Sequence, residues 1–541
     1  MVSNLFPPFP AGPPAIMRNR LVVLLSFVLI LTGIRAFLAA TIELSPNESY
    51  YYLWAQHPDF SYYGKGPGVV LAILAGTSLF GSTEFGVRFL GPLFGLGTSV
   101  FVYLLARKLV REKAAFWAVL AVNLLPIFHL HSIVMTPDGP SLFFWAATLY
   151  TCWLAIERGG NFSLFWPLTG ILIGLGFLCD YWNAIQLFSI LFFLSAVPRY
   201  RHQLRRPGFY VCFLVFLLFL TPLIIWNYQH EWIALEHLPE RGDLRMAFQI
   251  RPSRLIEFLE SQLLLFSPLM LLGYLIAFFA CIRKSFQNSK VCFLFAFAWP
   301  ALIQFFILGL RRGEPQTWTG PAFLSLGVLA VHFWMHFATE NRIAGTLCIS
   351  ALVLSGVSSS LLTNTDIVRA VGIPFPYSAD PTSGWRGWRT MAEQVEKFRA
   401  EFEAKLGGKV FLIGDTYQTS SALSFYLADK RPEGPGHPPV YIPESQDIQN
   451  QFSFWPRYDE FLEADTSSKK DTTFSEEAGI NPFIDRTALY ITEEPEQAPP
   501  QNLQSAFTRC ELVALFKIDR KNYPLREIRV FACYQYQTLP L

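Results

Sequence analysis

The sequence predicts an α-helical polytopic membrane protein of about eleven transmembrane helices, followed by a C-terminal soluble α/β domain. Composition is the first reason, because 52% of the 541 residues are hydrophobic and only 16% are charged, against about 25% charged in an average soluble domain. The distribution of apolar residues is the second. Before about residue 362 they form repeated runs of roughly 20 residues, enough to cross a hydrocarbon core of about 30 Å at about 1.5 Å per residue. Beyond that point the chain has the composition of an ordinary globular domain.

The apolar runs define eleven candidate spans, which together form a membrane core over residues 21–362. The first run is too long for the apolar region of a signal peptide and lacks a small-residue cleavage site, so we expect it to be retained as a span. The run at 68–80 is too short to cross and predicts an interfacial or re-entrant helix. The predicted spans are 21–40, 88–106, 114–131, 141–156, 164–179, 183–198, 209–227, 257–281, 291–309, 318–337 and 343–362.

The loops between these spans predict an orientation. If the N-terminus (1–20) is cytoplasmic, fifteen Lys and Arg residues fall in inner segments and eight in outer ones, which is the bias of cytoplasmic loops. An odd number of spans then places the tail (363–541) outside. The first outer loop (41–87) and the connection at 228–256 are long, and loops carry function more often than the spans they join. We therefore expect the outer face to be the functional one.

The first outer loop contains two candidate functional groups. Ser45 and Glu48 have the spacing of a helix cap, and the aromatic face that includes Tyr51 suits the membrane surface. One interpretation is therefore an amphipathic interfacial helix with a solvated Glu48. The other is catalytic: Glu48 takes a proton from an acceptor hydroxyl, while the glycine-flanked Lys65 holds a phosphate.

Three further polar positions allow two interpretations each. Asp138 lies in a proline-flanked turn, where local sequence favours capping of the following helix. Asp180 follows an apolar run, and an acid at membrane depth is costly unless it is functional or lies among the headgroups. Arg311 and Arg312 run against the charge bias; they either neutralise an anionic lipid headgroup or form a solvated pair with Glu314.

The tail has the pattern of a small α/β domain without a catalytic constellation. Strand-like segments lie at 410–414, 440–442, 488–492, 512–516 and 528–534, and a helix-like segment lies at 419–428. His437 is isolated and predicts a loop residue. An acceptor-binding or lid role and a purely structural role both stay open for this domain.

The eight cysteines fall into two groups. Six lie in or beside apolar runs without ligand-like spacing, which predicts small core residues. Cys510 and Cys533 would face each other across a hairpin that turns near Asn522. A disulfide between them is an option if that side of the membrane is oxidising.

Several segments, taken in order over residues 20–335, resemble one family. They are Asn47-Glu48-Ser49-Tyr50-Tyr51, Tyr62-Tyr63-Gly64-Lys65-Gly66-Pro67, Glu84-Phe85-Gly86-Val87-Arg88, Thr136-Pro137-Asp138, Gly174-Leu175-Gly176 and Gly313-Glu314-Pro315-Gln316-Thr317-Trp318, with Gly387-Trp388-Arg389 and Asp415-Thr416-Tyr417-Gln418 in the tail. This ordered set resembles the GT-C membrane glycosyltransferases of the protein O-mannosyltransferase and aminoarabinose transferase superfamily. The bacterial glycosyltransferase family 39 branch is the closest match.

The resemblance implies transfer of a sugar from a polyprenyl-phosphate donor to an acceptor on the outer face, with inversion and without a nucleotide-sugar site. The acceptor would be a lipid, a glycan or a protein, and the compartment a bacterial inner membrane. The family has an Asp in its first outer loop that acts as base or orients the acceptor, and here Asn47 stands in that position. An amide cannot accept a proton, so Glu48, Asp138 or Asp59 takes the role, or activity is lost.

The resemblance also implies a donor site. Lys65 aligns with the lysine that holds the carrier phosphate, and Arg311 or Arg312 would meet the departing charge. Asp180 stands where many relatives carry a lysine, and Gly64 replaces an acid implicated in metal binding. No cofactor and no metal ligand set is therefore predicted, although a divalent metal is not ruled out.

The remaining predictions complete this picture. Tyr51, Tyr63, Asp59 and Asp180 are the predicted residues of the donor and acceptor pocket. Two competing functions are a catalytically inactive relative that binds polyprenyl lipids and, less favoured, a transporter. Against a transporter stand the lack of an internal repeat and the few charges within the spans. Nothing in the composition points to nucleic acid.

Overall fold

The computed structural model describes residues 14–158, 162–233, 252–312, 319–460, 481–494 and 498–539. The chain forms two compact units. The first comprises Met1–Thr41 and Asp59–Ile367, and the second comprises Ile42–Pro58 and Val368–Leu541. The predicted division at 362/363 differs in two respects, because the first unit continues to Ile367 and because residues 42–58 of the first outer loop belong to the second unit.

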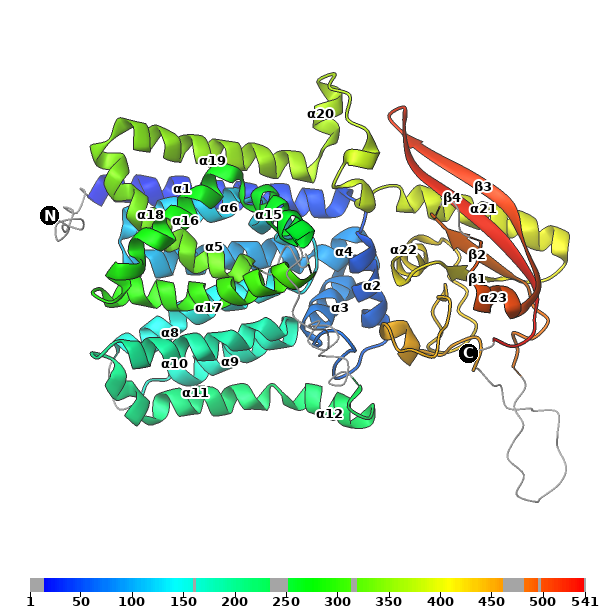
Figure 1. Cartoon of the computed structure of the whole chain (residues 1–541), viewed down its shortest axis with the longest axis horizontal. Coiled ribbons are helices and arrows are strands. Elements are labelled where there is room, and N and C mark those ends of the chain that lie inside the picture. Colours follow the sequence, from blue (N-terminus) through cyan, green and yellow to red (C-terminus); the bar gives the residue numbers. More distant parts are fainter. Residues whose placement is uncertain are drawn as a thin grey trace, which may run out of the picture. The chain divides into compact units, whose positions relative to one another are not determined.

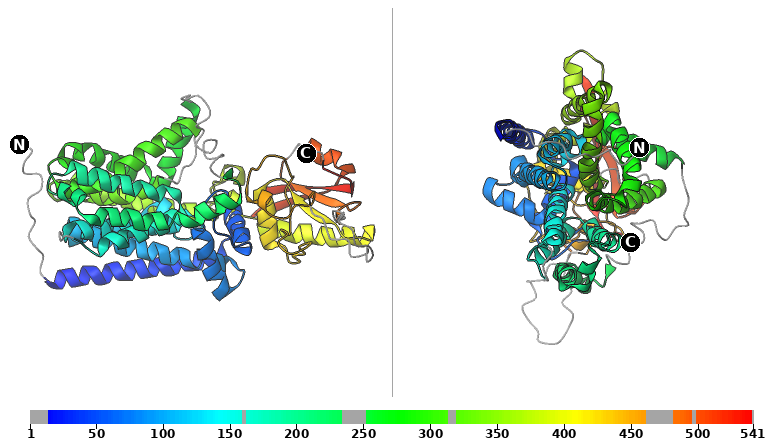
Figure 2. Two further views of the ribbon diagram at one scale, coloured as in Figure 1. Left: turned by 90° about the horizontal axis from the view of Figure 1, so that it is seen from below. Right: turned by 90° about the vertical axis from the view of Figure 1, so that its left-hand side faces the viewer.

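The first unit is a bundle of helices that run side by side, with α1 at one edge (Figures 1 and 2). Its elements are α1 (Pro14–Thr41), α3 (Gly68–Phe80), α4 (Glu84–Arg88), α5 (Leu90–Leu109), α6 (Glu112–Leu124), α7 (Pro126–His131), α8 (Asp138–Glu157), α9 (Phe165–Cys179), η1 (Tyr181–Ala184), α10 (Ile185–Ala196), η2 (Arg201–Arg205), α11 (Pro207–Leu218), α12 (Thr221–Gln229), α15 (Pro252–Phe266), α16 (Pro268–Ser285), α17 (Ser289–Arg312), α18 (Gly320–Glu340) and α19 (Arg342–Thr363). The helix α20 (Asp366–Ala370) follows.

Within the described residues, 8 helices are long and apolar enough to cross a membrane. The apolar helices Gly68–Phe80, Phe165–Cys179 and Tyr181–Ala196 are shorter, so the predicted count of eleven is not confirmed. Side chains on the outer helices suit a bilayer, since α1 and α19 bury only 17% of their apolar windows within the protein. Apolar surface of this kind is stable only in contact with lipid.

Two predicted spans are not continuous helices. The segment predicted as 114–131 bends between α6 and α7, where Pro126 begins α7. The segment predicted as 257–281 breaks at Ser267, whose φ is 62°, before Pro268 begins α16. Proline lacks an N–H and disfavours the helical conformation of the preceding residue, which explains both interruptions.

A buried arginine ties α1 to the middle of the bundle. Arg35 is 1% exposed, and it donates to Asn123 Oδ1 at 2.9 Å and to the Asn123 carbonyl at 3.2 Å. Asn123 in turn donates to Ser99 Oγ at 2.8 Å. A charge at this depth is tolerated because its donors are paired within the protein.

The second unit is built on a four-stranded sheet of order β1-β2-β4-β3. β1 pairs with β2 in parallel, whereas the β2–β4 and β3–β4 pairs are antiparallel. The strands are β1 (Phe411–Gly414), β2 (Ala488–Thr492), β3 (Phe507–Arg520) and β4 (Tyr523–Tyr536). The helical elements are α2 (Pro46–Gln56), η3 (Tyr377–Ala379), η4 (Ser383–Trp385), α21 (Trp388–Leu406), α22 (Tyr417–Tyr426), η5 (Gln451–Phe454) and α23 (Gln501–Ser505).

The segment 42–58 joins this unit through aromatic and polar contacts of α2. The Tyr50 ring lies 4.7 Å from that of Tyr417 and 6.0 Å from that of Phe452. The Tyr50 hydroxyl accepts from the Gln451 N–H at 2.6 Å. These partners are distant in sequence, which is why sequence patterns placed α2 with the membrane core.

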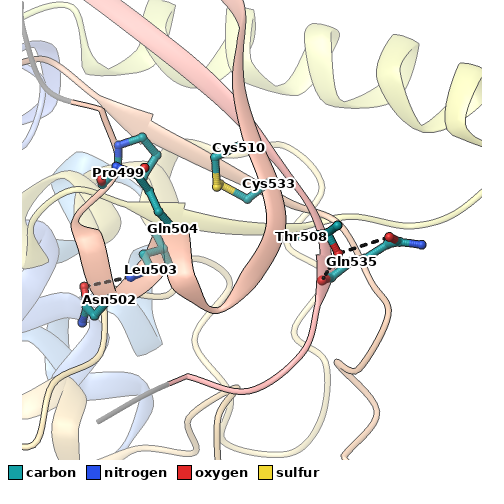
Figure 3. Close-up of a disulfide and its surroundings, with 8 residues drawn as sticks. All are labelled: Pro499, Asn502, Leu503, Gln504, Thr508, Cys510, Cys533 and Gln535. Atoms are coloured by element: carbon teal, nitrogen blue, oxygen red, sulfur yellow. Dashed lines mark hydrogen bonds between the residues drawn. A yellow bond between two sulfur atoms is a disulfide. The ribbon is translucent and has the colours of Figure 1, made fainter.

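The tail predictions are largely confirmed. The sheet strands lie where predicted, but the segment predicted at 440–442 forms only an isolated bridge between Tyr441 and Ile413. The β3–β4 hairpin turns at Lys521 and Asn522, whose φ angles are 48° and 65°, as short hairpin turns require. Cys510 and Cys533 are opposed across this hairpin and form a disulfide (Figure 3).

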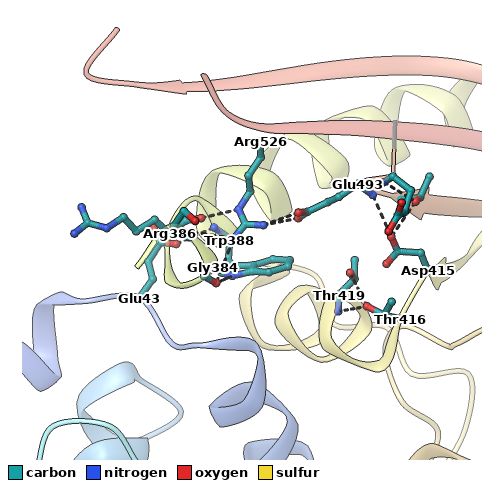
Figure 4. A network of polar contacts seen from close by, with 12 residues as sticks. Glu43, Gly384, Arg386, Trp388, Asp415, Thr416, Thr419, Glu493 and Arg526 are labelled. Carbon is teal, nitrogen blue, oxygen red and sulfur yellow. Dashed lines mark hydrogen bonds and ion pairs between the residues drawn. The ribbon is translucent and has the colours of Figure 1, made fainter. Parts of the chain in front are cut away.

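A polar cluster surrounds Arg526 of β4 (Figure 4). Arg526 donates to Glu493 Oε2 at 2.8 Å and to the Arg386 carbonyl at 2.6 Å. Its guanidinium lies 3.8 Å over the Trp388 ring. The backbone N–H of Trp388 donates to Glu43 Oε2 at 2.8 Å, so this cluster also binds the start of segment 42–58.

Candidate active site

The Lys65 turn lies against the end of α9 in the first unit. A Cβ atom added to Gly66 would lie 2.4 Å from the Leu178 carbonyl oxygen, and one added to Gly68 would lie 2.5 Å from Cys179 Sγ. The two glycines therefore allow an approach that any side chain would block. As a result Lys65 Nζ reaches Asp180 Oδ2 at 2.9 Å.

Asp180 sits where α9 gives way to η1. Its carboxylate caps η1 by accepting from the Trp182 N–H at 3.3 Å. The side chains of Lys65 and Asp180 are 18% and 6% exposed. Burial raises the pKa of Asp180 and neighbouring Asp138 adds to this, whereas Lys65 opposes the rise. Asp180, which stands where the resembled family often carries a lysine, is therefore a carboxylate that holds Lys65 in place.

Asp138 lies beside this pair. It lines a cavity of about 10 Å³ together with Asp180 and Asn183, a volume that holds about one water molecule. Asp138 Oδ2 accepts from Thr136 Oγ1 at 3.0 Å and lies 3.9 Å from His131 Nδ1. Asp138, Asp180 and Lys65 therefore form one charged cluster.

The prediction that Asp138 caps α8 is wrong. Asp138 is the first residue of α8, the N-cap is Pro137, and no side-chain cap bond is formed. Instead, the Asp138 carboxylate accepts a hydrogen bond from the Thr136 hydroxyl. A carboxylate that is not used by the helix backbone is available for chemistry.

Buried amides support the cluster. Asn183 Nδ2 donates to Ser141 Oγ at 2.6 Å, and Gln186 Nε2 donates to Asn183 Oδ1 at 3.0 Å. These contacts link α8, η1 and α10 behind Asp138 and Asp180. Sequence patterns do not single out these residues, although Ser141 is three residues after Asp138 and so lies on the same helix face.

Two predicted pocket residues lie in the segment before Lys65. Asp59 Oδ2 accepts from Trp226 Nε1 at 3.0 Å, and the Asp59 N–H donates to the Tyr62 hydroxyl at 3.1 Å. Burial raises the pKa of Tyr62 to about 12. Tyr63 is 7% exposed. Asp59 thus anchors the loop to α12, a role that the sequence did not indicate.

Three predicted site residues lie in α2, in the second unit. Glu48 is fully buried, and its Oε2 accepts from the Ser45 N–H at 2.9 Å and from Ser45 Oγ at 3.0 Å. The capping box is confirmed, whereas the expectation of a solvated Glu48 is wrong. Asn47 is exposed, and the Tyr51 ring packs 5.1 Å from that of Trp54.

The two predicted arginines end α17 (Ser289–Arg312), but the side chains of Arg311 and Arg312 lie outside the described residues. The same is true of the motif at 313–318, including Glu314. Their predicted role in phosphate binding stays a prediction. Among the residues that the structure does describe, no three His, Cys, Asp or Glu side chains gather in an arrangement that would hold a metal ion.

Comparison with solved structures shows the class of fold. The crystal structure of ArnT from Cupriavidus metallidurans in the apo state matches with a TM-score of 0.58 and 15% identity, over 95% of this chain and 98% of that chain. ArnT bound to undecaprenyl phosphate matches with a TM-score of 0.59 and 15% identity, over 95% of this chain and 97% of that one. The protein therefore has the fold of the GT-C membrane glycosyltransferases, as the resemblance implied, and it is an integral membrane protein.

Sequence comparisons point to the same class. Residues 64–226 match the family model described as dolichyl-phosphate-mannose-protein mannosyltransferase, and this range contains Lys65, Asp138 and Asp180. The lipid A galacturonosyltransferase RgtD of Rhizobium johnstonii is 25% identical over 318 residues, which is 58% of this chain and 65% of RgtD. The match thus covers just under two-thirds of that relative.

Proposed function

We propose that the protein is a membrane glycosyltransferase that moves a sugar from a polyprenyl-phosphate donor to an acceptor at the membrane surface. The observation that carries the proposal is the cluster of Lys65, Asp180 and Asp138 within a fold shared with ArnT. The solved ArnT complex contains undecaprenyl phosphate, and RgtD is a lipid A galacturonosyltransferase. A lipid A-like acceptor is therefore the first to test, before glycans and proteins.

Lys65 is the proposed ligand of the donor phosphate. An ammonium has three donors, so Lys65 can keep its bond to Asp180 and donate a second one to a phosphate oxygen. The ion pair also holds the flexible lysine stem in one direction, which lowers the entropy lost on binding. As the sugar–phosphate bond breaks, charge grows on the departing phosphate, and a fixed cation stabilises that charge.

Asp138 is the proposed base. Its side chain is 19% exposed, and it lines the cavity beside Asp180 without capping α8. Glu48, by contrast, is fully buried, and its Oε2 accepts a hydrogen bond from the Ser45 N–H. In the proposed step the acceptor hydroxyl oxygen bonds to the anomeric carbon while the carbon–oxygen bond to phosphate breaks. The hydroxyl proton passes to Asp138, and the polyprenyl phosphate leaves with its bonding pair, inverting the anomeric centre.

We also propose that the N-terminus is cytoplasmic and the second unit extracytoplasmic. The excess of basic residues in the loops predicted to lie on the same side of the membrane as the N-terminus supports this orientation. The Cys510–Cys533 disulfide supports it as well, because such bonds persist in oxidising compartments.

Radiolabelled sugar transfer in membranes tests the proposal. Lys65→Ala should abolish both transfer and binding of undecaprenyl phosphate, because the phosphate loses its cation. Asp138→Asn should lower transfer by about 10²- to 10⁴-fold, the usual contribution of a general base, while undecaprenyl phosphate binding persists. Glu48→Gln serves as the control and should retain most transfer.

The variants also distinguish the assignments. Full activity of Lys65→Ala would remove the proposed donor site. If Glu48→Gln loses transfer while Asp138→Asn keeps it, Glu48 is the base. As a control for expression, the amount of each variant in the membrane is measured on the same samples, and transfer is compared per amount of protein.

A catalytically inactive relative that binds polyprenyl lipids is the second candidate. The observation that favours it is Asn47, an exposed amide in the first turn of α2 where the family carries an Asp. This reading expects the wild type to bind undecaprenyl phosphate and to transfer no sugar from any donor of a panel. Appearance of transfer in Asn47→Asp alone would support it.

A further inference from the structure

A second cavity lies in the first unit among α6, α16, α18 and α19. Its volume is about 420 Å³, within the range of about 300–1,000 Å³ that small-molecule ligands occupy. The wall is almost entirely apolar, with Trp117, Met270, Tyr274 and Trp334 among its larger side chains.

The cavity opens along the apolar surface of the bundle. Leu272, Leu347 and Ile349 line it and are themselves 55%, 53% and 58% exposed. Exposed leucine and isoleucine of this kind face hydrocarbon in a membrane protein. A lipid chain can therefore enter from the side without crossing a polar barrier.

One end of the cavity is cationic. Lys113 lines it beside Thr339, and Arg20 and Arg111 are close enough to act electrostatically on Lys113. Lys284 and Lys290 act together with Arg111 on the nearby His332. Such a group of basic residues beside a membrane attracts anionic headgroups.

This end is remote from the candidate active site. Pro321 of α18 lines the small cavity of Asp138 and Asp180, whereas Thr339 of the same helix lines the large one. Eighteen residues of helix separate them, which is about 27 Å at about 1.5 Å per residue. The basic end of the large cavity therefore lies at the opposite end of α18 from the proposed chemistry.

We propose that this cavity binds an anionic glycerophospholipid, with one acyl chain among α6, α16, α18 and α19 and the phosphate against Lys113. The apolar wall accounts for the chain, and the basic group accounts for a net negative headgroup. A zwitterionic lipid would bring its own cation to the same place and bind less well. The site does not depend on the proposed glycosyl transfer.

Native mass spectrometry of the purified full-length protein tests this inference. Dioleoyl-phosphatidylglycerol and dioleoyl-phosphatidylcholine have the same chains and differ in headgroup charge. We expect the wild type to retain phosphatidylglycerol at least about fivefold more strongly. Lys113→Ala should remove that preference, and Ala338→Trp, which fills the cavity, should lower retention of both lipids.

Matched controls separate the site from the general lipid shell. Ala75→Trp adds the same bulk to an exposed position of α3, and Arg199→Ala removes a cation that does not line the cavity; both should retain wild-type binding. Met335→Trp, which also fills the cavity, replaces Ala338→Trp if that variant does not fold by size exclusion.

Two results would overturn the inference. The first is retention of phosphatidylglycerol by the cavity-filling variants at the wild-type level, or equal retention of the two lipids by the wild type. The second is displacement of phosphatidylglycerol by undecaprenyl phosphate at equimolar concentration in the wild type, which would make the occupant a polyprenyl lipid.

Discussion

Ion pairs in the two units are built differently. In the second unit, Arg526 binds Glu493, donates to two backbone carbonyls at 2.6 and 3.3 Å and stacks on an indole ring. Arg369 and Asp380 form a second such pair at 2.9 Å, with side chains 3% and 0% exposed. In the first unit, Lys65 and Asp180 meet at 2.9 Å beside a cavity that a second carboxylate, Asp138, also lines.

The difference separates a structural pair from the pair that we propose to be functional. A guanidinium fork whose donors are met by a carboxylate, carbonyls and a ring has a fixed geometry and little reason to exchange partners. In the Lys65 cluster one ammonium lies beside two carboxylates, and burial together with Asp138 raises the pKa of Asp180. Arrangements of this kind persist mainly where they serve binding or catalysis.

Among changes outside the charged cluster, Gly66→Ala is expected to lower sugar transfer most, and it tests whether Lys65 must be held against α9. The new Cβ would lie 2.4 Å from the Leu178 carbonyl oxygen, so the turn must shift and carry Lys65 with it. Misplacement by about 1 Å can lower a rate about 10²-fold, and we expect a loss of that order in sugar transfer. Gly33→Ala is the control, because nothing lies within 4 Å of its added Cβ. Unchanged transfer by Gly66→Ala would show that the close approach is not needed.

The structural pairs should affect folding and leave the chemistry intact. Arg369→Met leaves Asp380 buried without its cation, and breaking a buried pair costs about 3–5 kcal/mol. We expect this loss in denaturant unfolding of the full-length protein, monitored by protease cleavage within the second unit. The double variant Arg369→Met/Asp380→Leu should recover most of it. A single variant as stable as the wild type would contradict the structural role.

The disulfide tests both stability and orientation. Cys510 and Cys533 are separated by 23 residues, and closing a loop of that size contributes about 3 kcal/mol by the chain-entropy model. The double variant Cys510→Ser/Cys533→Ser should unfold at correspondingly lower denaturant concentration. In intact cells, a thiol reagent that does not cross the membrane should modify these cysteines only after reduction. Lack of modification in intact cells even after reduction, with modification once the cells are lysed, would place the second unit on the cytoplasmic side.

A pH-dependent effect is expected from a carboxylate of the second unit that is buried beside a cation. Burial raises the pKa of Glu444 to about 8, although Arg457 lies 3.4 Å away and opposes the rise. The unfolded chain loses this proton near pH 4.5, so from there to about pH 8 the folded state holds one proton more. Stability from this group is therefore greatest at low pH and falls as the pH rises through that window.

Thermal unfolding at pH 5 and pH 8 measures this effect. The melting temperature of the wild type should fall between the two values by more than that of Glu444→Gln, whose side chain does not titrate. An equal change in melting temperature between pH 5 and pH 8 for the two proteins would show that Glu444 is ionised throughout this range. Its contact with Arg457 alone would favour that state.

The sequence by itself determined the membrane class, the soluble tail, most of its strands and the cluster members Lys65, Asp138 and Asp180. Apolar runs, alternating strands and charges in a membrane span are local signals, and local signals survive without a partner. The capping box at Ser45 and Glu48 belongs to the same category, because its hydrogen bonds span three residues. Asn522 likewise marks the hairpin that brings Cys510 and Cys533 together.

Only the tertiary structure decided which of these residues belong together. The assignment of α2 to the second unit depends on ring contacts with Tyr417 and Phe452, some 370 and 400 residues away along the chain. The pairing of Lys65 with Asp180 joins residues 115 apart, and no periodicity carries that information. Packing also decided that Asp138 does not cap α8 and that Glu48 is buried rather than solvated. Long-range contacts determine burial, and burial determines which carboxylates remain accessible.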